Sequence, residues 1–118
     1  MKSEVKTETS GRKIVLNACT EPCAIEQGMR LIGGKWTGSI IYHLKDNPVR
    51  FNDLCRMLGG ASRKMIDQRL KELEANGMVK REVLETRPIA VAYHLTDYGR
   101  SALVILEQMR VWMEQHQL

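Results

Sequence analysis

The chain has 118 residues, 43% of them hydrophobic and 27% charged, and a formal net charge of +4. This length suits one domain with a small core, and the mild basic excess favours an anionic partner such as nucleic acid. There is no apolar run long enough to span a membrane, no secretory signal in the polar start MKSEVKTETSGRK, and an odd set of three cysteines, so we expect a cytoplasmic protein without a disulfide framework.

The beginning of the chain predicts a polar arm followed by a helix. Residues 1–13 are polar and charged, and we expect a flexible arm ahead of a single domain at 14–118. Segment 20–34 predicts a helix, because Pro22 suits a first turn and a Gly-Gly pair suits the end. Its apolar residues recur at helical spacing: Ile25, Met29 and Ile32.

Two further helices are predicted before the middle of the chain. Segment 50–60 predicts a short helix with Asn52 as a possible cap, closed by a second Gly-Gly pair. Segment 35–47 precedes it and predicts a helix that an Asn-Pro pair stops. One face of that earlier helix should hold three apolar residues: Trp36, Ile40 and Leu44.

A fourth helix is predicted at 62–76, with Ser62 as its N-cap and a stop at the Asn-Gly pair that follows. Ile66, Leu70 and Leu73 lie at positions i, i+4 and i+7 and should face the core. The opposite face carries a charged and amide-bearing set, spaced to share one side of the helix: Arg63, Lys64, Asp67, Gln68 and Lys71.

The second face of this helix has the chemistry that enters a major groove. Arginine or lysine can bond guanine and glutamine can bond adenine, while the free amides near Ser62 suit a phosphate. Asp67 would accept from cytosine N4 or form a salt bridge with Arg63 or Lys71. The alternative is that this face is ordinary solvated surface.

Two extended segments, 78–85 and 90–95, predict a β-hairpin, and Thr96 then caps a long final helix at 96–118. The order of elements predicts a mainly α fold with a small β-hairpin (α+β). We interpret it as a winged helix-turn-helix with the helix-turn-helix at 51–76 and the wing at 79–95. The wing carries three basic residues suited to phosphate or minor-groove contact: Lys80, Arg81 and Arg87.

The final helix is apolar around most of its circumference, which predicts burial on more than one side. A domain this small covers one side, so we expect a second copy of the chain to cover another; the alternative is a long core helix in a monomer. The predicted dimer interface comprises Leu103, Leu106, Met109, Trp112 and Met113.

Three segments together resemble the HxlR family of bacterial winged helix-turn-helix regulators: CAIEQGMRLIGGKWTGSII, RFNDLCRMLGGASRKMIDQRLKELEANGMVKRE and VAYHLTDYGRS. The resemblance runs from about Cys23 to the end of the chain, with the motifs in order and correctly spaced. It implies a homodimeric DNA-binding transcription factor, with 62–76 as the recognition helix and 79–95 as the wing. The wing departs from the family pattern, because relatives often have two prolines where this chain has only Pro88.

The cysteines add a hypothesis about redox sensing. Cys23 is predicted in the first turn of the first helix, where the helix dipole would lower the pKa of its thiol. It also matches the family's N-terminal cysteine, which some relatives use to sense oxidants or electrophiles, and Cys19 is a candidate resolving partner. The alternative for Cys23 is a small core residue, which is our prediction for Cys55.

These features favour a sequence-specific transcription regulator, acting as a repressor and homodimer on a pseudo-palindromic operator of double-stranded DNA. The second hypothesis is a winged-helix module that binds a partner protein and no DNA. We expect no enzyme, because no nucleophile has a recognisable base and no glycine-rich phosphate loop follows a strand. We expect no metal or other cofactor, because the candidate ligands lack a recognisable spacing: Cys19, Cys23, His43 and His94.

Overall fold

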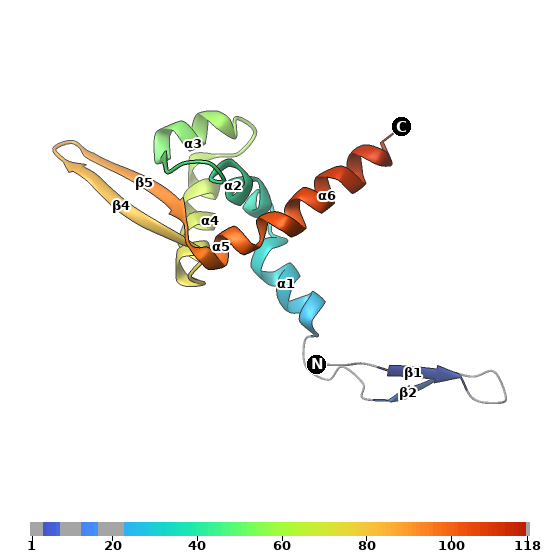
Figure 1. Ribbon diagram of the computed structural model, residues 1–118. Helices are drawn as coiled ribbons and strands as arrows, with labels where there is room; N and C mark the ends of the chain where they lie inside the picture. Colours follow the sequence, from blue (N-terminus) through green and yellow to red (C-terminus); the bar gives the residue numbers. More distant parts are fainter. Residues whose placement is uncertain (1–3, 8–12, 17–22, 118) are drawn as a thin grey trace.

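The computed structural model describes residues 4–7, 13–16 and 23–117, and shows a winged helix-turn-helix (Figure 1). Four helices come first in the domain: α1 (Ala24–Ile32), α2 (Thr37–His43), α3 (Phe51–Met57) and α4 (Arg63–Ala75). The short strand β3 (Val49–Arg50) precedes α3. The chain then forms β4 (Val79–Thr86), β5 (Ile89–Leu95), α5 (Asp97–Ser101) and α6 (Leu103–Gln115).

Ahead of this domain, β1 (Glu4–Thr7) and β2 (Lys13–Leu16) pair in antiparallel fashion, with Glu4 opposite Leu16. Neither strand was predicted from the sequence, because each is only four residues long and lies in a mostly polar stretch without a long alternating pattern. Two of the residues singled out from the sequence, Cys19 and Pro22, lie outside the described residues.

The core forms where α2, α3 and α4 pack on the inner end of the sheet. The predicted core face of α4 is confirmed, since Ile66, Leu70 and Leu73 are all buried. They pack in one cluster with residues of α2, α3 and the strands: Ile40, Ile41, Leu44, Leu54, Leu58, Val79, Tyr93 and Leu95. Because these side chains come from α2, α3 and the strands, the core fixes α4 relative to the wing.

Trp36 corrects one prediction. It is not part of the predicted helix but is the N-cap of α2, with left-handed backbone angles of φ 72° and ψ −10°, and its ring packs partly on the core that contains Ile40 and Leu44. A non-glycine residue in this region costs about 1–2 kcal/mol, so tertiary contacts must stabilise it. One such contact is the edge of the indole against Gly60, where a Cβ would lie 3.0 Å from Trp36 Cη2.

The helix caps are partly as predicted. Ser62 Oγ accepts from the backbone N–H of Met65 at 3.0 Å, and Thr96 Oγ1 accepts from that of Gly99 at 3.0 Å. Asn52 is not a cap, because α3 begins one residue earlier and its N-cap is Arg50. The reason is that Val49 and Arg50 pair with Tyr93 and Ala92 of β5, so the chain passes directly from a strand into the helix.

The sheet has the order β3-β5-β4 and is antiparallel throughout. The wing register sets Val79 opposite Leu95 and Arg81 opposite Tyr93, with an irregularity between Val83 and Glu85. Figure 1 shows β4 and β5 extending well beyond the helical body as a long wing. The predicted hairpin is confirmed, and within this sheet the two-residue strand β3 was not predicted.

The single final helix predicted at 96–118 is instead two helices, α5 and α6, that meet at Ala102. The backbone N–H of Ala102 donates to Gly99 O at 3.2 Å, a tighter turn than the α-helical one, while its side chain is buried in the core. This arrangement anchors α5 to the domain, whereas α6 extends away from it. Helix α1 also extends away from the domain (Figure 1).

Candidate nucleic-acid interface

The outer face of α4 is the centre of the candidate interface. Arg63, Lys64, Gln68 and Lys71 are exposed, as the sequence predicted, and Asp67 is half-buried beside them. The N-cap residue Ser62 is also exposed, and it already uses its hydroxyl to cap the helix. The basic and amide side chains of this face offer hydrogen-bond donors toward the N-terminal end of α4. The opposite face of the helix is packed in the core.

Arg63 is held by two residues of α3 that the sequence did not connect with it. Its guanidinium donates to Asn52 Oδ1 at 2.8 Å and lies over the ring of Phe51, with Cζ 5.0 Å from the centroid. Both contacts orient the side chain before any ligand arrives, which lowers the entropy lost on binding. Only the packing of α3 against α4 brings these residues together.

Asp67 forms one of the salt bridges considered from the sequence. Its carboxylate lies 2.9 Å from Lys71 Nζ, one helical turn away. This hydrogen bond and the attraction of the charges raise the pKa of Lys71. The ammonium group of Lys71 is therefore positioned toward Asp67 in the absence of DNA.

Arg69 lies on the same helix but is turned inward. Its Nε donates to the backbone oxygen of Lys35 at 3.0 Å, and its guanidinium pairs with Glu72 at 2.9 Å. This residue therefore ties the loop between α1 and α2 to α4.

In the wing, the three predicted basic residues are all exposed: Lys80, Arg81 and Arg87. Burial raises the pKa of Tyr93, and the charge and hydrogen bond of Arg81, its partner across the strands, act in the opposite direction. Arg81 thus belongs to the base of the wing, where Tyr93 holds it, whereas Arg87 lies in the turn at the tip. The wing also exposes apolar side chains: Val83, Leu84 and Ile89.

An apolar surface extends over the two helices that leave the domain. On α1, Ile25 is 78% exposed, and on α6 Trp112 is 58% exposed; neither helix has a buried residue. Of the predicted interface residues, Leu103 and Leu106 pack partly on the core of their own domain. The others are exposed: Met109, Trp112 and Met113.

The cysteines occupy different environments. Cys23 is the N-cap of α1, one residue before the first turn in which the sequence placed it, because the helix begins at Ala24. It is half-buried, and its backbone oxygen accepts from the N–H of Gln27 at 2.9 Å. Cys55 packs against the core, as predicted.

The described residues carry neither a metal-ligand cluster nor a membrane-spanning helix. Within residues 4–7, 13–16 and 23–117, no three histidine, cysteine, aspartate or glutamate side chains cluster as a metal site would require. No helix in the same part of the chain has the length and apolar character needed to cross a membrane.

Comparison with known proteins agrees with this geometry. The model of the HxlR-like helix-turn-helix family matches residues 31–117. The HTH-type transcriptional regulator YybR of Bacillus subtilis is 41% identical over 96 residues, which cover 81% of this chain and 77% of that protein. YodB of the same organism, also an HTH-type transcriptional regulator, is 38% identical over 91 residues, covering 77% of this chain and 81% of YodB.

A solved structure of the redox regulator HypR in its reduced form has a TM-score of 0.74 and 40% identity, and the match covers 79% of this chain and 92% of HypR. These relatives are transcriptional regulators and not enzymes, which agrees with the prediction from the sequence that the chain is not an enzyme. The matched family model, the identities and the shared fold lead to one conclusion: the chain belongs to the HxlR-like family of helix-turn-helix transcriptional regulators.

Proposed function

We propose that this protein is a homodimeric, sequence-specific DNA-binding repressor that acts in the cytoplasm. The observation that carries the proposal is the exposed donor face of α4, in which Arg63 is already oriented by Asn52 and Phe51. In this proposal Arg63, Lys64 and Gln68 read bases in the major groove, while Arg87 at the wing tip contacts the adjacent backbone or minor groove.

The dimer is proposed on the apolar surface of α1 and α6. A two-fold axis there would present two copies of α4 to half-sites about 34 Å apart, or a multiple of one helical turn, on a pseudo-palindrome. With no separate effector domain in the described residues, repression would come from occluding a promoter, in our proposal one beside a divergent neighbouring gene.

Gln68 is expected to read a base. Replacing it with alanine should lower the preference for operator over scrambled DNA by about 1–3 kcal/mol, because a bidentate contact to adenine would be lost. Fluorescence anisotropy with both duplexes measures this difference. Glu74→Ala, an exposed change at the other end of the same helix, serves as the control, and a Gln68→Ala protein with unchanged preference would remove Gln68 from the interface.

Arg87 is expected to contact phosphate without reading sequence. Arg87→Ala should weaken binding to operator and scrambled DNA alike and reduce the slope of log affinity against log salt by about one. A salt titration from low to moderate ionic strength gives the slope. An unchanged slope would mean that the wing tip does not contact the backbone.

We also propose that Cys23 senses oxidants. Its place at the start of α1 supports this, since α1 carries part of the proposed dimer surface, and so does the similarity to the redox regulator HypR. Diamide would take two electrons and two protons from two thiols and leave a disulfide, either between the two copies of Cys23 or with Cys19. This bond would change the angle between subunits and hence the spacing of the recognition helices.

The oxidant response has a clear test in the cysteine variants. Diamide should lower operator affinity at least about tenfold in the wild type and in Cys55→Ser, whereas Cys23→Ser should not respond. Anisotropy before and after diamide, with recovery on adding a thiol, measures the effect. A full response in Cys23→Ser would contradict the assignment.

A second candidate function is a protein-interaction module that binds no DNA. The specific observation in its favour is the apolar surface of the wing. Ile89 of β5 is 71% exposed, and Val83 and Leu84 of the paired strand β4 are exposed as well. The basic face of α4 favours DNA over this alternative. Binding to neither duplex at any salt concentration would favour the interaction module.

A further inference from the structure

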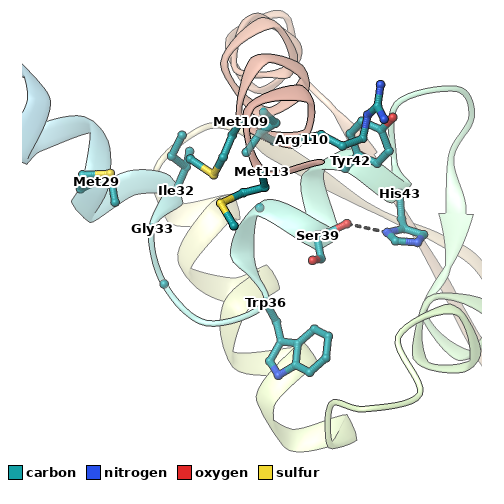
Figure 2. A pocket seen from close by; sticks show the side chains of 13 residues that line it. Met29, Ile32, Gly33, Trp36, Ser39, Tyr42, His43, Met109, Arg110 and Met113 are labelled. Carbon is teal, nitrogen blue, oxygen red and sulfur yellow. Dashed lines mark hydrogen bonds between the residues drawn. The ribbon is translucent and has the colours of Figure 1, made fainter. Parts of the chain in front are cut away.

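A cavity of about 420 Å³ lies between α1, α2 and α6, apart from the proposed DNA-binding face (Figure 2). This volume is within the range of roughly 300–1,000 Å³ that is typical of small-molecule sites. Its walls come from three elements and from the loop that joins α1 to α2, and most of the lining is apolar.

The lining divides into an apolar and a polar side. Met109, Met113 and Ile32 gather on one side of the cavity, and Tyr42, Arg110 and His43 lie on the other (Figure 2). Thioether and aliphatic side chains adapt readily to a flat apolar molecule, and sulfur contacts with aromatic rings are favourable. The lining residues thus fit an aromatic body with one polar end.

The polar side favours a hydroxyl group over an anion. Arg110 is already paired with Glu107 and with Glu114, at 2.8 Å from the latter, so its charge is neutralised. The Nδ1–H of His43 donates to the backbone oxygen of Ser39 at 2.7 Å. In the neutral ring this leaves Nε2 as an acceptor, which suits a donated O–H.

The cavity wall is also connected to the recognition helix. Trp36 lines the cavity, and its indole edge rests on Gly60 in the turn just before Ser62 and α4. The neighbouring Lys35 accepts the hydrogen bond from Arg69 of α4 at 3.0 Å. A molecule that displaces Trp36 would therefore act on the turn before α4 and on Arg69 within α4, through a loop already held in an uncommon backbone conformation.

We infer that this cavity is an effector site for a small neutral aromatic molecule carrying a hydroxyl group, and that its occupation alters DNA affinity. The second half of the inference rests on the proposed DNA-binding function. Met29, Met109 and Met113 belong to both the cavity and the exposed apolar surface, so a dimer would close the mouth of the site and retain the ligand at the interface.

The first experiment measures binding alone, with 2-naphthol as the probe and the full chain in isothermal titration calorimetry. We expect one 2-naphthol per chain and at least fivefold weaker binding of 2-naphthoate, because Arg110 in the lining is already paired with Glu107 and Glu114. His43→Leu should weaken 2-naphthol about tenfold and leave naphthalene unaffected. His116→Leu is a matched control, because the Nδ1–H of His116 donates to Trp112 O at 2.8 Å in the same way but the residue does not line the cavity.

Three outcomes would overturn the site. They are no 2-naphthol binding to the wild type, equal losses in His43→Leu and His116→Leu, and binding only in a monomeric variant. The last would mean that side chains of a second copy fill the cavity.

The second experiment measures operator affinity by anisotropy with and without saturating 2-naphthol. We expect at least a fivefold change in the wild type and a smaller one in Arg69→Gln, which breaks the bond to Lys35 but leaves the cavity lining intact. Operator binding that 2-naphthol leaves unchanged would overturn the regulatory link while the proposed function stood. No operator binding at all would instead defeat the proposed function, and calorimetry would still decide whether the cavity binds its ligand.

Discussion

Replacing Trp112 with glutamate is expected to convert the dimer into a monomer and to weaken operator binding by more than about 100-fold, because two linked half-site contacts become one. Trp112 is the largest exposed apolar side chain of α6, and aromatic residues of this kind contribute most to interfaces. A carboxylate at this position would lose its hydration in the interface without gaining a partner.

Sedimentation equilibrium gives the mass, which should fall from that of two chains to that of one, and circular dichroism should show that the variant keeps its helices. Tyr98→Glu is the matched control, since Tyr98 is an exposed aromatic residue on α5, outside the apolar surface of α1 and α6. A wild-type protein that sediments as one chain, or a Trp112→Glu protein that stays dimeric, would contradict the proposed interface.

Gly99→Ala is expected to produce the largest loss of stability, about 3 kcal/mol in the free energy of unfolding. A Cβ at this position would overlap the backbone oxygen of Met78, which also accepts from the N–H of Thr96 at 3.0 Å. Because Met78 lies in the turn between α4 and β4, the added methyl group would push α5 away from that turn and strain the cap in which Thr96 Oγ1 accepts from the N–H of Gly99.

Urea unfolding followed by circular dichroism measures this loss, with Gly77→Ala as the comparison. Gly77 has a φ of 76° but open space around its missing side chain, so alanine there should cost only about 1–2 kcal/mol through backbone strain. A smaller loss for Gly99→Ala than for Gly77→Ala would mean that the close packing of Met78 against Gly99 is relaxed in solution.

Helix α4 was the most predictable element, for reasons that are local in the sequence. Ser62 supplies a cap, the Asn-Gly pair supplies a stop, and the apolar residues between them keep one helical period, so bounds and core face both followed. The same local signals located the hairpin and the cap at Thr96.

The features that sequence reasoning missed depend on contacts between distant segments. β3 has only two residues and exists because β5 pairs with it, which in turn moves the start of α3 and removes Asn52 from the cap position. Trp36 adopts left-handed angles that its own side chain disfavours, and the burial of Ala102 accompanies the break in the final helix.

The candidate site also combines features that are local in the sequence with features that depend on contacts between distant segments. Helical spacing was enough to predict the exposed face of α4, but not that Asn52 orients Arg63 or that Arg69 turns inward to Lys35. The cavity draws its walls from three helices, so no single stretch of sequence contains its pattern.

The most direct test of the proposed function is the anisotropy of the wild-type protein on DNA from the region upstream of its own gene, against a scrambled duplex, at low and high salt. We predict that the upstream DNA binds with a dissociation constant of about 10⁻⁸ M or lower, at least roughly 10³-fold tighter than the scrambled duplex, and that affinity falls steeply with salt. Failure to bind either duplex, even at low salt, would contradict DNA recognition by α4.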